Sequence, residues 1–418
     1  MKPPETSPFA LTGAVIVDGR GGAPLPGHAV IITDDRIVDI VPAARLPESV
    51  MRHDLSGMTL LPGLIDAHVH LLGQRSMDNS QMTFVGEGLR AARATADLAR
   101  LLAAGITTVR DCGSYTALAL KQAVVEGSVP GPRIVACGRF IERTGGADDA
   151  PYMSVAWAQE GGPWAPRLAD GPDEIRKAVR EQLRAGADWI KTCTTGAVTT
   201  QESSRPDLLE WSDEEIATLV EEAHRLGSRV AVHAHANAGI RQALNANADT
   251  IEHGTYLDDE TARMMADQGK YLVPTLFVLH ELVERGADFG TPAWVLVKAR
   301  EVKIARQASL EAAFRHGVPI AMGTDIGGQD LLPHGRNAAE LALLVAAGMS
   351  PSAAIVAGTS GAAHCICLEA DIGAIEVGKV ADLIALPGDP LDDITILQDV
   401  PWVMQSGRVV HDRRGAVA

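Results

Sequence analysis

Short aliphatic runs alternate with amphipathic stretches through the middle of the chain. Most of the amphipathic stretches end at Gly or Asn, as LLAAG and FRHG do, which is typical of a helix followed by a buried strand. Eight aliphatic runs follow this rule, at residues 64–70, 107–113, 133–138, 189–194, 229–235, 250–254, 271–275 and 319–325. Alternating strands and helices predict a parallel sheet, and eight repeats predict an α/β fold of the (β/α)8 TIM barrel type. An open, doubly wound sheet is the alternative.

The pattern changes at both ends of the chain, where short strand-like runs are separated by turns rich in Asp, Gly and Pro. Neither end has enough apolar residues for a core of its own. We therefore expect residues 1–61 and 373–418 to form one composite β-sandwich domain. The barrel, at residues 62–372, would then be inserted between these two segments.

Composition supports a globular α/β protein, because 46% of the residues are hydrophobic and only 4% are aromatic. A formal net charge of -16 without any basic block argues against nucleic acid as a partner. No apolar run approaches the roughly 20 residues that span a bilayer, so we expect no membrane partner. The N-terminal segment lacks the apolar core of a signal peptide, and the cysteines are odd in number. Both features favour a reduced, cytoplasmic protein.

Two histidines end the first predicted strand. His68 and His70 are two positions apart in LLPGLIDAHVH, so a strand places both imidazoles on the same face. Barrel enzymes have their active sites at the carboxyl ends of the strands, and two imidazoles there can chelate one metal ion. The alternative is a pair of core histidines, which would require buried hydrogen-bond partners for both rings.

A lysine interrupts the apolar run of the fourth predicted strand. Burial of Lys191, in GADWIKTCT, would disfavour the ammonium form, lower its pKa and make the neutral amine available. Such an amine can add carbon dioxide to form a carbamate, whose two oxygens can bridge two cations. Considered alone, a lysine near a strand end is more often a surface residue.

Further ligand-type residues end strands five, six and eight. His233 and His235 are two positions apart in RVAVHAH, and His253 ends TIEH. Imidazole suits zinc and similar metals, and we predict His233 as the ligand because it lies deeper in its strand, with His235 at the rim. Asp325 can take a proton from a metal-activated water, although a helix N-cap is the alternative for this residue. Ligand-type residues at five strand ends favour a metal site.

In their sequence context these residues resemble the amidohydrolase superfamily, in its binuclear, carboxylated-lysine branch. LLPGLIDAHVH, GITTVRDCG, GADWIKT, VAVHAHANAGI, DTIEHGTYLD, GTDIGG and GAIEVGKVADLIAL are similar to motifs of prolidase-like and imidazolonepropionase-like amidohydrolases. Ochratoxin-hydrolysing enzymes are among these relatives. The resemblance covers nearly the whole chain, including both β-rich ends.

The resemblance implies two divalent metal ions, with Zn2+ as the expected metal. It implies six metal-binding residues: His68, His70, Lys191, His233, His253 and Asp325. Carbamylated Lys191 and a hydroxide would bridge the two ions. Asp325 would act as a catalytic residue, accepting the proton of the attacking hydroxide and passing it to the leaving amine.

The implied activity is a metal-dependent amidohydrolase that cleaves an amide bond to an amino acid. Its substrate would be a small molecule: a dipeptide ending in proline or a hydrophobic residue, or an N-acyl amino acid, ochratoxin-type amides included. The alternatives are opening of a cyclic amide, as in imidazolonepropionase, hydrolysis of a lactone or ester, and a non-catalytic role. The last is disfavoured because all six ligands are present. The resemblance also implies a homo-oligomer, since octamers are common among relatives.

One motif departs from the pattern of these relatives, which often carry TGGHGD after strand three. This chain has TGGADD at residues 144–149, so Ala147 replaces the histidine that relatives use near the substrate carbonyl. His235, Tyr256 and His334 are the candidate substrate-binding residues, with ordinary packing or loop roles as the alternative.

Metal-binding histidines need further residues that orient their rings. Asp66 and Glu252 are sequence neighbours of the predicted ligands. Strand alternation directs both side chains away from those ligands, so neither is assigned a role.

Overall fold

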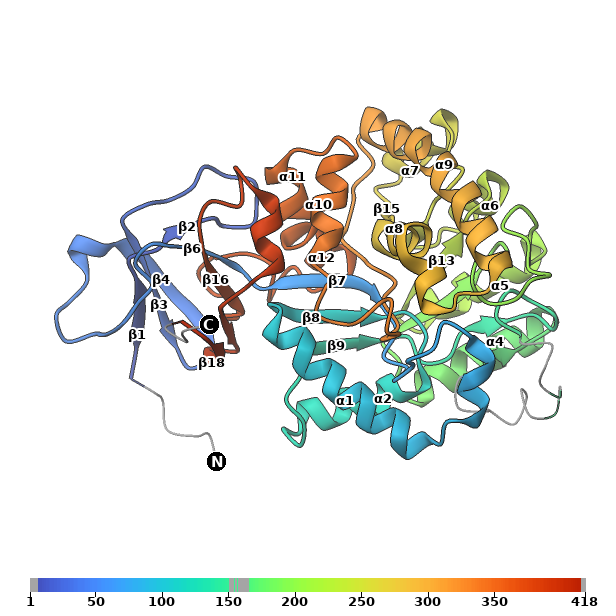
Figure 1. Ribbon diagram of the computed structural model, residues 1–418, viewed down its shortest axis with the longest axis horizontal. Coiled ribbons are helices and arrows are strands. Elements are labelled where there is room, and N and C mark those ends of the chain that lie inside the picture. The colour runs from blue at the N-terminus through green and yellow to red at the C-terminus, as the bar shows by residue number, and fades with distance from the viewer. Residues whose placement is uncertain (1–6, 150–153, 155, 157–164, 415–418) are drawn as a thin grey trace. The chain divides into compact units, whose positions relative to one another are not determined.

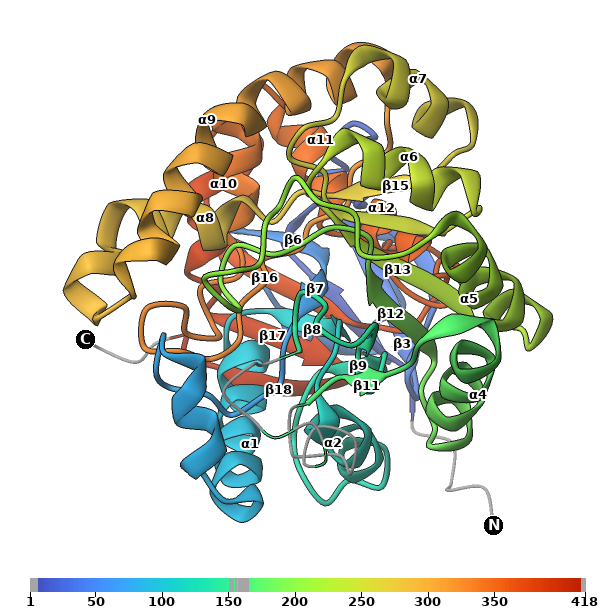
Figure 2. The ribbon, with the colours of Figure 1, turned by 90° about the vertical axis from the view of Figure 1, so that its right-hand side faces the viewer.

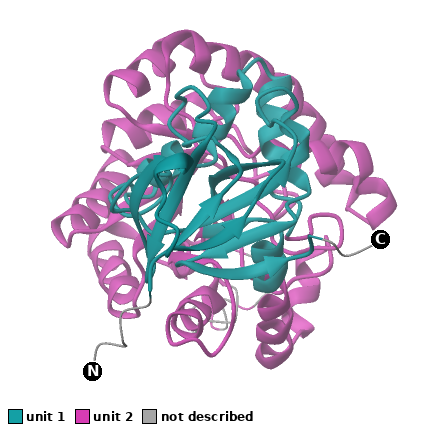
Figure 3. Cartoon of the chain, turned by 90° about the vertical axis from the view of Figure 1, so that its left-hand side faces the viewer, with its two compact units in different colours: residues 1–66, 98–108, 335–418 teal, residues 67–97, 109–334 magenta. Residues whose placement is uncertain are grey.

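The structure is a computed structural model that describes residues 7–149, 154, 156 and 165–414. The chain divides into two compact units (Figure 3). The terminal unit consists of residues 1–66, 98–108 and 335–418, and the central unit consists of residues 67–97 and 109–334. Of the helices that the structure describes, none is both long and apolar enough to cross a lipid bilayer.

The terminal unit is rich in β-strands from both ends of the chain. The strands are β1 (Phe9–Thr12), β2 (Val15–Ile16), β3 (His28–Thr33), β4 (Arg36–Pro42), β5 (Met51–Asp54), β6 (Met58–Pro62), β16 (Leu383–Pro387), β17 (Trp402–Gln405) and β18 (Arg408–Asp412). One sheet has the order β4-β3-β1-β5, and the other has the order β18-β17-β16-β6-β2. In the second sheet β6 pairs antiparallel with β16, so strands from both chain ends share one sheet (Figure 1).

These two sheets also share one apolar core. Val30 and Ile32 of β3 belong to the same buried cluster as Leu60 of β6, Leu383 of β16 and Trp402 of β17. Each of these side chains is at most 1% exposed. Helical segments complete the unit: η1 (Ala43–Arg45), α10 (Ala339–Ala346), α11 (Pro351–Ala357), α12 (Ser360–Cys365) and η4 (Ile394–Gln398).

Parallel strands form the centre of the other unit. They are β7 (Leu64–Val69) and β8 (Ile106–Asp111), which end in it, and β9 (Arg133–Ala136), β10 (Ile141–Glu142), β11 (Arg167–Leu168), β12 (Trp189–Cys193), β13 (Arg229–Ala234), β14 (Thr250–His253) and β15 (Tyr271–Val273). One sheet has the order β7-β8-β9, and the other has the order β11-β10-β12-β13-β14-β15 with all pairs parallel. A backbone hydrogen bond of 2.7 Å from Asp188 N to Ala136 O links β9 to the segment that enters β12.

Helices connect these strands and lie around them (Figure 2). They are η2 (Asn79–Phe84), α1 (Glu87–Ala103), α2 (Tyr115–Val125), α4 (Gly171–Arg184), α5 (Asp213–Arg225), α6 (Asn237–Asn245), α7 (Asp259–Asp267), α8 (Leu276–Arg285), η3 (Gly286–Phe289) and α9 (Ala293–His316). Helix α5 begins after Ser212, which forms a reciprocal capping box with Glu215 of the first turn. Parallel strands require such crossover connections.

Strands β7, β8, β9, β12, β13, β14 and β15 occupy the first seven predicted runs, but the eighth run differs. Residues 319–325 form single bridges and backbone hydrogen bonds rather than a regular strand, such as the bridge between Leu272 and Ile320. Pro319 has no N–H to donate, and Asp325 has a left-handed backbone with φ 60, so regular pairing is limited at the two ends of the run. The expectation of a regular eighth strand is therefore wrong.

Candidate metal centre

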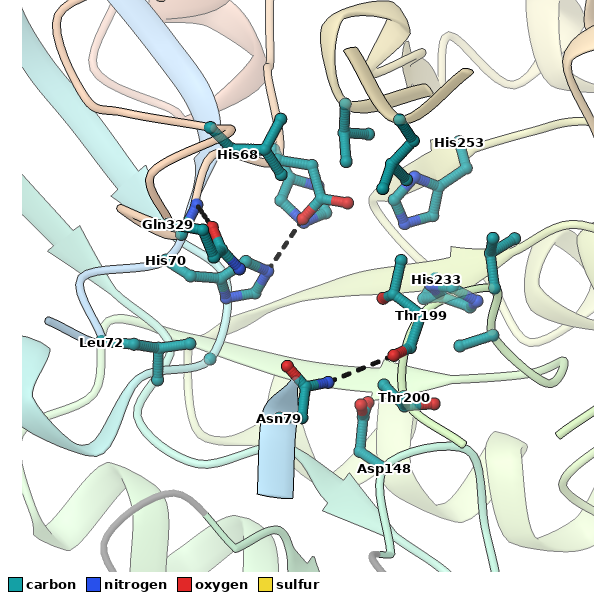
Figure 4. Close-up of a pocket in the computed structure, with 18 of the residues that line it drawn as sticks. His68, His70, Leu72, Asn79, Asp148, Thr199, Thr200, His233, His253 and Gln329 are labelled. Atoms are coloured by element: carbon teal, nitrogen blue, oxygen red, sulfur yellow. Dashed lines mark hydrogen bonds and ion pairs between the residues drawn. The ribbon is translucent and has the colours of Figure 1, made fainter. Parts of the chain in front are cut away.

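The six predicted metal-binding residues line one cavity of the central unit, at the carboxyl ends of its strands. They are His68, His70, Lys191, His233, His253 and Asp325, and we call them the six-residue centre. Figure 4 shows the imidazoles of His68, His70, His233 and His253 around this cavity. Residues from β7, β12, β13 and β14 meet here because parallel strands present their carboxyl ends at the same edge.

The imidazole rings lie within one metal-sized cluster. The centroid of the His68 ring is 5.3 Å from that of His70 and 5.2 Å from that of His253. The rings of His233 and His253 are 4.5 Å apart. Asp325 Oδ1 lies 3.1 Å from His70 Nε2 and 3.5 Å from His68 Nε2. His68, His253 and Asp325 thus offer three ligand atoms within 4.8 Å of one another.

The charge states of these groups suit a metal site. Burial lowers the pKa of His233 to about 3 and that of His253 well below its usual range, so both rings are neutral. Burial alone would raise the pKa of Asp325, but the imidazoles of His68 and His70 lower it to about 2. The neutral imidazoles of His233 and His253 and the ionised carboxylate of Asp325 are the donor forms that zinc and similar divalent ions bind. His70 differs, because burial acts to lower its pKa but the hydrogen bond to Asp325 raises the pKa above its usual value.

Lys191 is buried, at 1% exposure, with its Nζ 5.5 Å from the centre of the Phe140 ring. Burial acts to lower its pKa, but the electrostatic effect of the acidic groups around it, Asp325 among them, raises the pKa above its ordinary value. The expectation of a lowered Lys191 pKa is therefore wrong for this arrangement of charges. The location of Lys191 in the cavity agrees with the sequence prediction, whereas its proton affinity does not.

A buried ion pair orients the His68 ring. His68 Nδ1 lies 2.7 Å from Glu252 Oε2, and Arg110 Nη2 donates to Glu252 Oε1 at 2.7 Å. Arg110 and Glu252 are both fully buried. Burial would raise the pKa of Glu252, but Arg110 and His68 lower it to about 2, so the carboxylate only accepts hydrogen bonds. Glu252 therefore holds a hydrogen on Nδ1 of His68, and Nε2 is the atom that a metal ion would bind.

The sequence argument that directed Glu252 away from the ligands is wrong. Alternation applies to an extended strand, but His253 has a left-handed backbone with φ 71. The turn at this residue lets Glu252 contact His68 while His253 faces the same cavity. Asp66 behaves differently, because its Oδ2 accepts a hydrogen bond of 2.7 Å from Asn337 within the terminal unit.

Two threonines and an arginine support the other rings. His253 Nδ1 lies 2.7 Å from Thr275 Oγ1, and His235 Nδ1 lies 2.7 Å from Thr255 Oγ1. Arg306 donates to Thr255 Oγ1 at 3.1 Å and to Thr275 O at 2.9 Å. One buried guanidinium therefore fixes the residues behind both histidines. Sequence analysis missed Arg306 because it lies on α9, far along the chain from either ring.

The predicted substrate-binding residues are placed differently from one another. His235 lines the cavity and stacks on His253 with ring centroids 5.0 Å apart. His334 is buried, with its Nε2 3.2 Å from His70 O, and Tyr256 is 40% exposed. Within the described part of the chain, neither His334 nor Tyr256 is among the residues that line the cavity.

Polar and apolar side chains complete the cavity wall. Phe140, Val278, Leu279, Leu282 and Leu332 supply apolar surface. Asn79, Asp148, Thr199, Thr200 and Gln329 supply polar groups, as Figure 4 shows. Apolar walls with a few placed polar groups are typical of sites for small molecules.

Comparison with known proteins identifies the family. The profile of the amidohydrolase family matches residues 59–410, and that of the NagA composite domain matches residues 9–60. Ochratoxinase of Aspergillus niger is 32% identical over 414 residues, covering 93% of this chain and 84% of that protein. The chain therefore belongs to the amidohydrolase family and is a hydrolase of the prolidase- and ochratoxinase-like group.

Solved structures agree with this assignment. A Xaa-Pro dipeptidase with methionine bound in its active site is 33% identical with a TM-score of 0.88, over 97% of this chain and 100% of that one. A prolidase complexed with N-methylphosphonate-L-proline is 30% identical with a TM-score of 0.91, over the same shares. These similarities support hydrolysis of amide bonds by this chain.

Proposed function

We propose that this chain is a binuclear metal-dependent amidohydrolase that cleaves the amide bond to the amino acid at the end of a dipeptide or of an N-acyl amino acid. The observation that carries the proposal is the convergence of the six-residue centre in one cavity. The dipeptidase, the prolidase and ochratoxinase among the similar proteins support the substrate class.

The residues present fit two divalent ions, with zinc the expected metal. His68 and His253 each have Nδ1 engaged, at 2.7 Å from Glu252 and Thr275, so each can offer Nε2. His68, His70 and Asp325 would hold one ion, and His233 and His253 the other. Bound metal ions would polarise the substrate carbonyl and lower the pKa of the attacking water.

Lys191 would join the two halves of the centre as a carbamate. Its ammonium form is favoured by the surrounding acidic groups, which raise its pKa. Cations that neutralise Asp325 and its neighbours would remove this effect and leave burial to favour the neutral amine. We therefore expect carbamylation of Lys191 to depend on the presence of metal ions.

Asp325 would move the proton during the reaction. Its Oδ1 is 3.1 Å from His70 Nε2, and its pKa of about 2 keeps it ionised at neutral pH. It can accept a proton from the attacking water and return it to the amine that leaves. The apolar side chains Phe140, Val278 and Leu282 line the same cavity and would contact a proline or hydrophobic residue of the substrate.

The proposal includes a closed (β/α)8 barrel. The hydrogen bond from Asp188 N to Ala136 O supports closure on one side. On the other side, residues 319–325 bridge β15 through Ile320, and Met322 O accepts a hydrogen bond from Ala67 N of β7. The proposal also includes assembly into a homo-oligomer, and measurement of the molecular mass in solution would test this assembly.

A substrate panel tests the proposed activity. The protein reconstituted with Zn2+ is incubated with Xaa-Pro dipeptides, N-acyl phenylalanines, a cyclic amide and a lactone, and the products are identified by mass spectrometry. Amide cleavage releases two molecules, whereas ring opening releases one. Release of a free amino acid from dipeptides or N-acyl amino acids is the expected result. Turnover of the cyclic amide or lactone alone would refute the proposed substrate class.

A further inference from the structure

A second group of ligand-type side chains lies beside the six-residue centre. Glu142 ends β10, Cys193 ends β12, and Asp148 lies on the segment that follows β10. These three residues, which we call the Glu-Asp-Cys cluster, offer ligand atoms within 4.8 Å of one another. All three belong to the central unit.

The carboxylate of Glu142 is buried without full hydrogen bonding. Glu142 and Cys193 are each 1% exposed. Glu142 receives a long hydrogen bond of 3.4 Å from Asp148 N at Oε2 and a hydrogen bond from the Cys193 thiol, and Glu142 Oε1 has no further partner among the described residues. Buried carboxylate oxygens are normally paired, because an unpaired one loses its hydration without compensation.

The neighbouring cations do not account for this negative charge. Arg143 Nη2 lies 2.6 Å from Glu210 Oε2, so its charge is directed to a different carboxylate. Lys191 attracts Asp148, but under the proposed function Lys191 carries a carbamate and loses its positive charge. Burial, and next the charge of Asp148, raise the pKa of Glu142 well above its usual range. Such a group requires either a proton or a cation.

We propose that Glu142, Asp148 and Cys193 bind a further divalent cation of the zinc type, distinct from those of the six-residue centre. With Zn–S of about 2.3 Å and Zn–O of about 2.1 Å, two ligands of a tetrahedral zinc ion lie about 3.6 Å apart. Cys193 Sγ and Asp148 Oδ2 are 3.7 Å apart. An S–H···O hydrogen bond has the same length, but it would leave Glu142 Oε1 without a partner, whereas a cation would bind that oxygen.

The combination of donors selects the kind of ion. A thiolate with two carboxylates suits zinc or cobalt, whereas magnesium and calcium prefer oxygen ligands alone. Three protein ligands leave one position for water. Asp148 also lines the main cavity, so the cation would hold the segment before residue 149 against the end of β12 and fix that part of the wall.

Cobalt reports on the thiolate directly. The metal-free protein is titrated with Co2+ and the near-ultraviolet thiolate-to-cobalt charge-transfer band is recorded. Wild-type protein and a Cys112→Ser variant are expected to develop the band, and Cys193→Ser is expected to lose it. Cys112 is the matched control because it is also buried, directly follows the end of β8 and lies close to His68 and Glu252. A band retained in Cys193→Ser, or absent from the wild type, overturns the proposal.

Zinc content provides an independent measurement. After reconstitution and gel filtration, Glu142→Gln and Cys193→Ser are expected to retain one equivalent of zinc per chain less than the wild type. This difference of one zinc equivalent tests the cation site independently of the proposed function, because it is expected whatever number of ions the six-residue centre holds. Equal zinc content in the wild type, Glu142→Gln and Cys193→Ser overturns the proposed cation site. The proposed function is tested separately, by the turnover of the substrate panel by the wild-type protein.

Discussion

Glu252→Gln tests whether the buried ion pair sets the metal affinity of His68. The carboxylate accepts from His68 Nδ1 and Arg110 Nη2 at 2.7 Å each, and from Thr250 Oγ1 at 2.5 Å. Glutamine has the same shape but only one acceptor oxygen. If that oxygen faces His68, Arg110 loses its carboxylate partner in a fully buried position. If it faces Arg110, the amide donates to Nδ1, and the imidazole hydrogen moves to Nε2.

Both orientations carry a cost that can be estimated. Removal of one partner from a buried ion pair costs about 3–5 kcal/mol of stability. A change in the group that orients a metal-binding histidine lowers metal affinity about 10- to 100-fold. That range corresponds to about 1.4–2.7 kcal/mol of binding free energy.

The two effects require separate measurements. Urea unfolding of the metal-free protein gives the stability, and competition with a chromophoric chelator gives the zinc dissociation constant. Glu222→Gln is the matched control, because Glu222 is also buried, at 5% exposure, and pairs with Arg180 of α4 and Arg225 of α5. It is expected to lower stability without changing zinc affinity. A folded Glu252→Gln protein with wild-type zinc affinity would refute the assigned role of Glu252.

Three further predictions concern the six-residue centre and the ion pair of helix α5. Lys191→Ala is expected to lose zinc and activity together, and wild-type zinc content with wild-type turnover would contradict its bridging role. Asp325→Asn is expected to lower kcat about 10^2- to 10^4-fold, because proton transfer is lost; steady-state kinetics at saturating zinc would show this. The pKa of Glu222 is lowered from 4.5 to about 2, chiefly by Arg225, so its stabilising effect is present above pH 4.5 and is lost as the pH falls towards 2. Thermal unfolding should therefore show a larger loss for the wild type than for Glu222→Gln over this acid range, and parallel curves would contradict the assignment.

The sequence predicts the residues of the cavity better than their local geometry. His68 and His70 could be assigned to one face because strand periodicity needs only neighbouring positions. Glu252 could not be assigned, because the left-handed backbone of His253 interrupts that periodicity. The pKa of Lys191 depends on charges such as Asp325, which lies more than a hundred positions away in the sequence and approaches it only through folding.

Dependence on contacts between distant residues also explains why the irregular eighth run and the Glu-Asp-Cys cluster could not be predicted. Pro319 is visible in the sequence, but its effect on the eighth run depends on which N–H groups the neighbouring strands require. Glu142 and Cys193 lie in separate strands, so no sequence spacing predicts their proximity. Contacts between residues distant in the sequence become visible only when the strands are aligned in register.

The pairing of β6 with β16 has a consequence for the order of events during synthesis. Thr59 Oγ1 donates to Gly388 O, a residue 329 positions later, at 2.6 Å. During translation, β6 therefore leaves the ribosome long before β16 has been synthesised. The edge of β6 that pairs with β16 stays without a partner strand while the intervening residues are synthesised. Contacts this distant form slowly, and exposed strand edges invite self-association. Nascent chains stalled before residue 383 should consequently depend on chaperones more than full-length chains do.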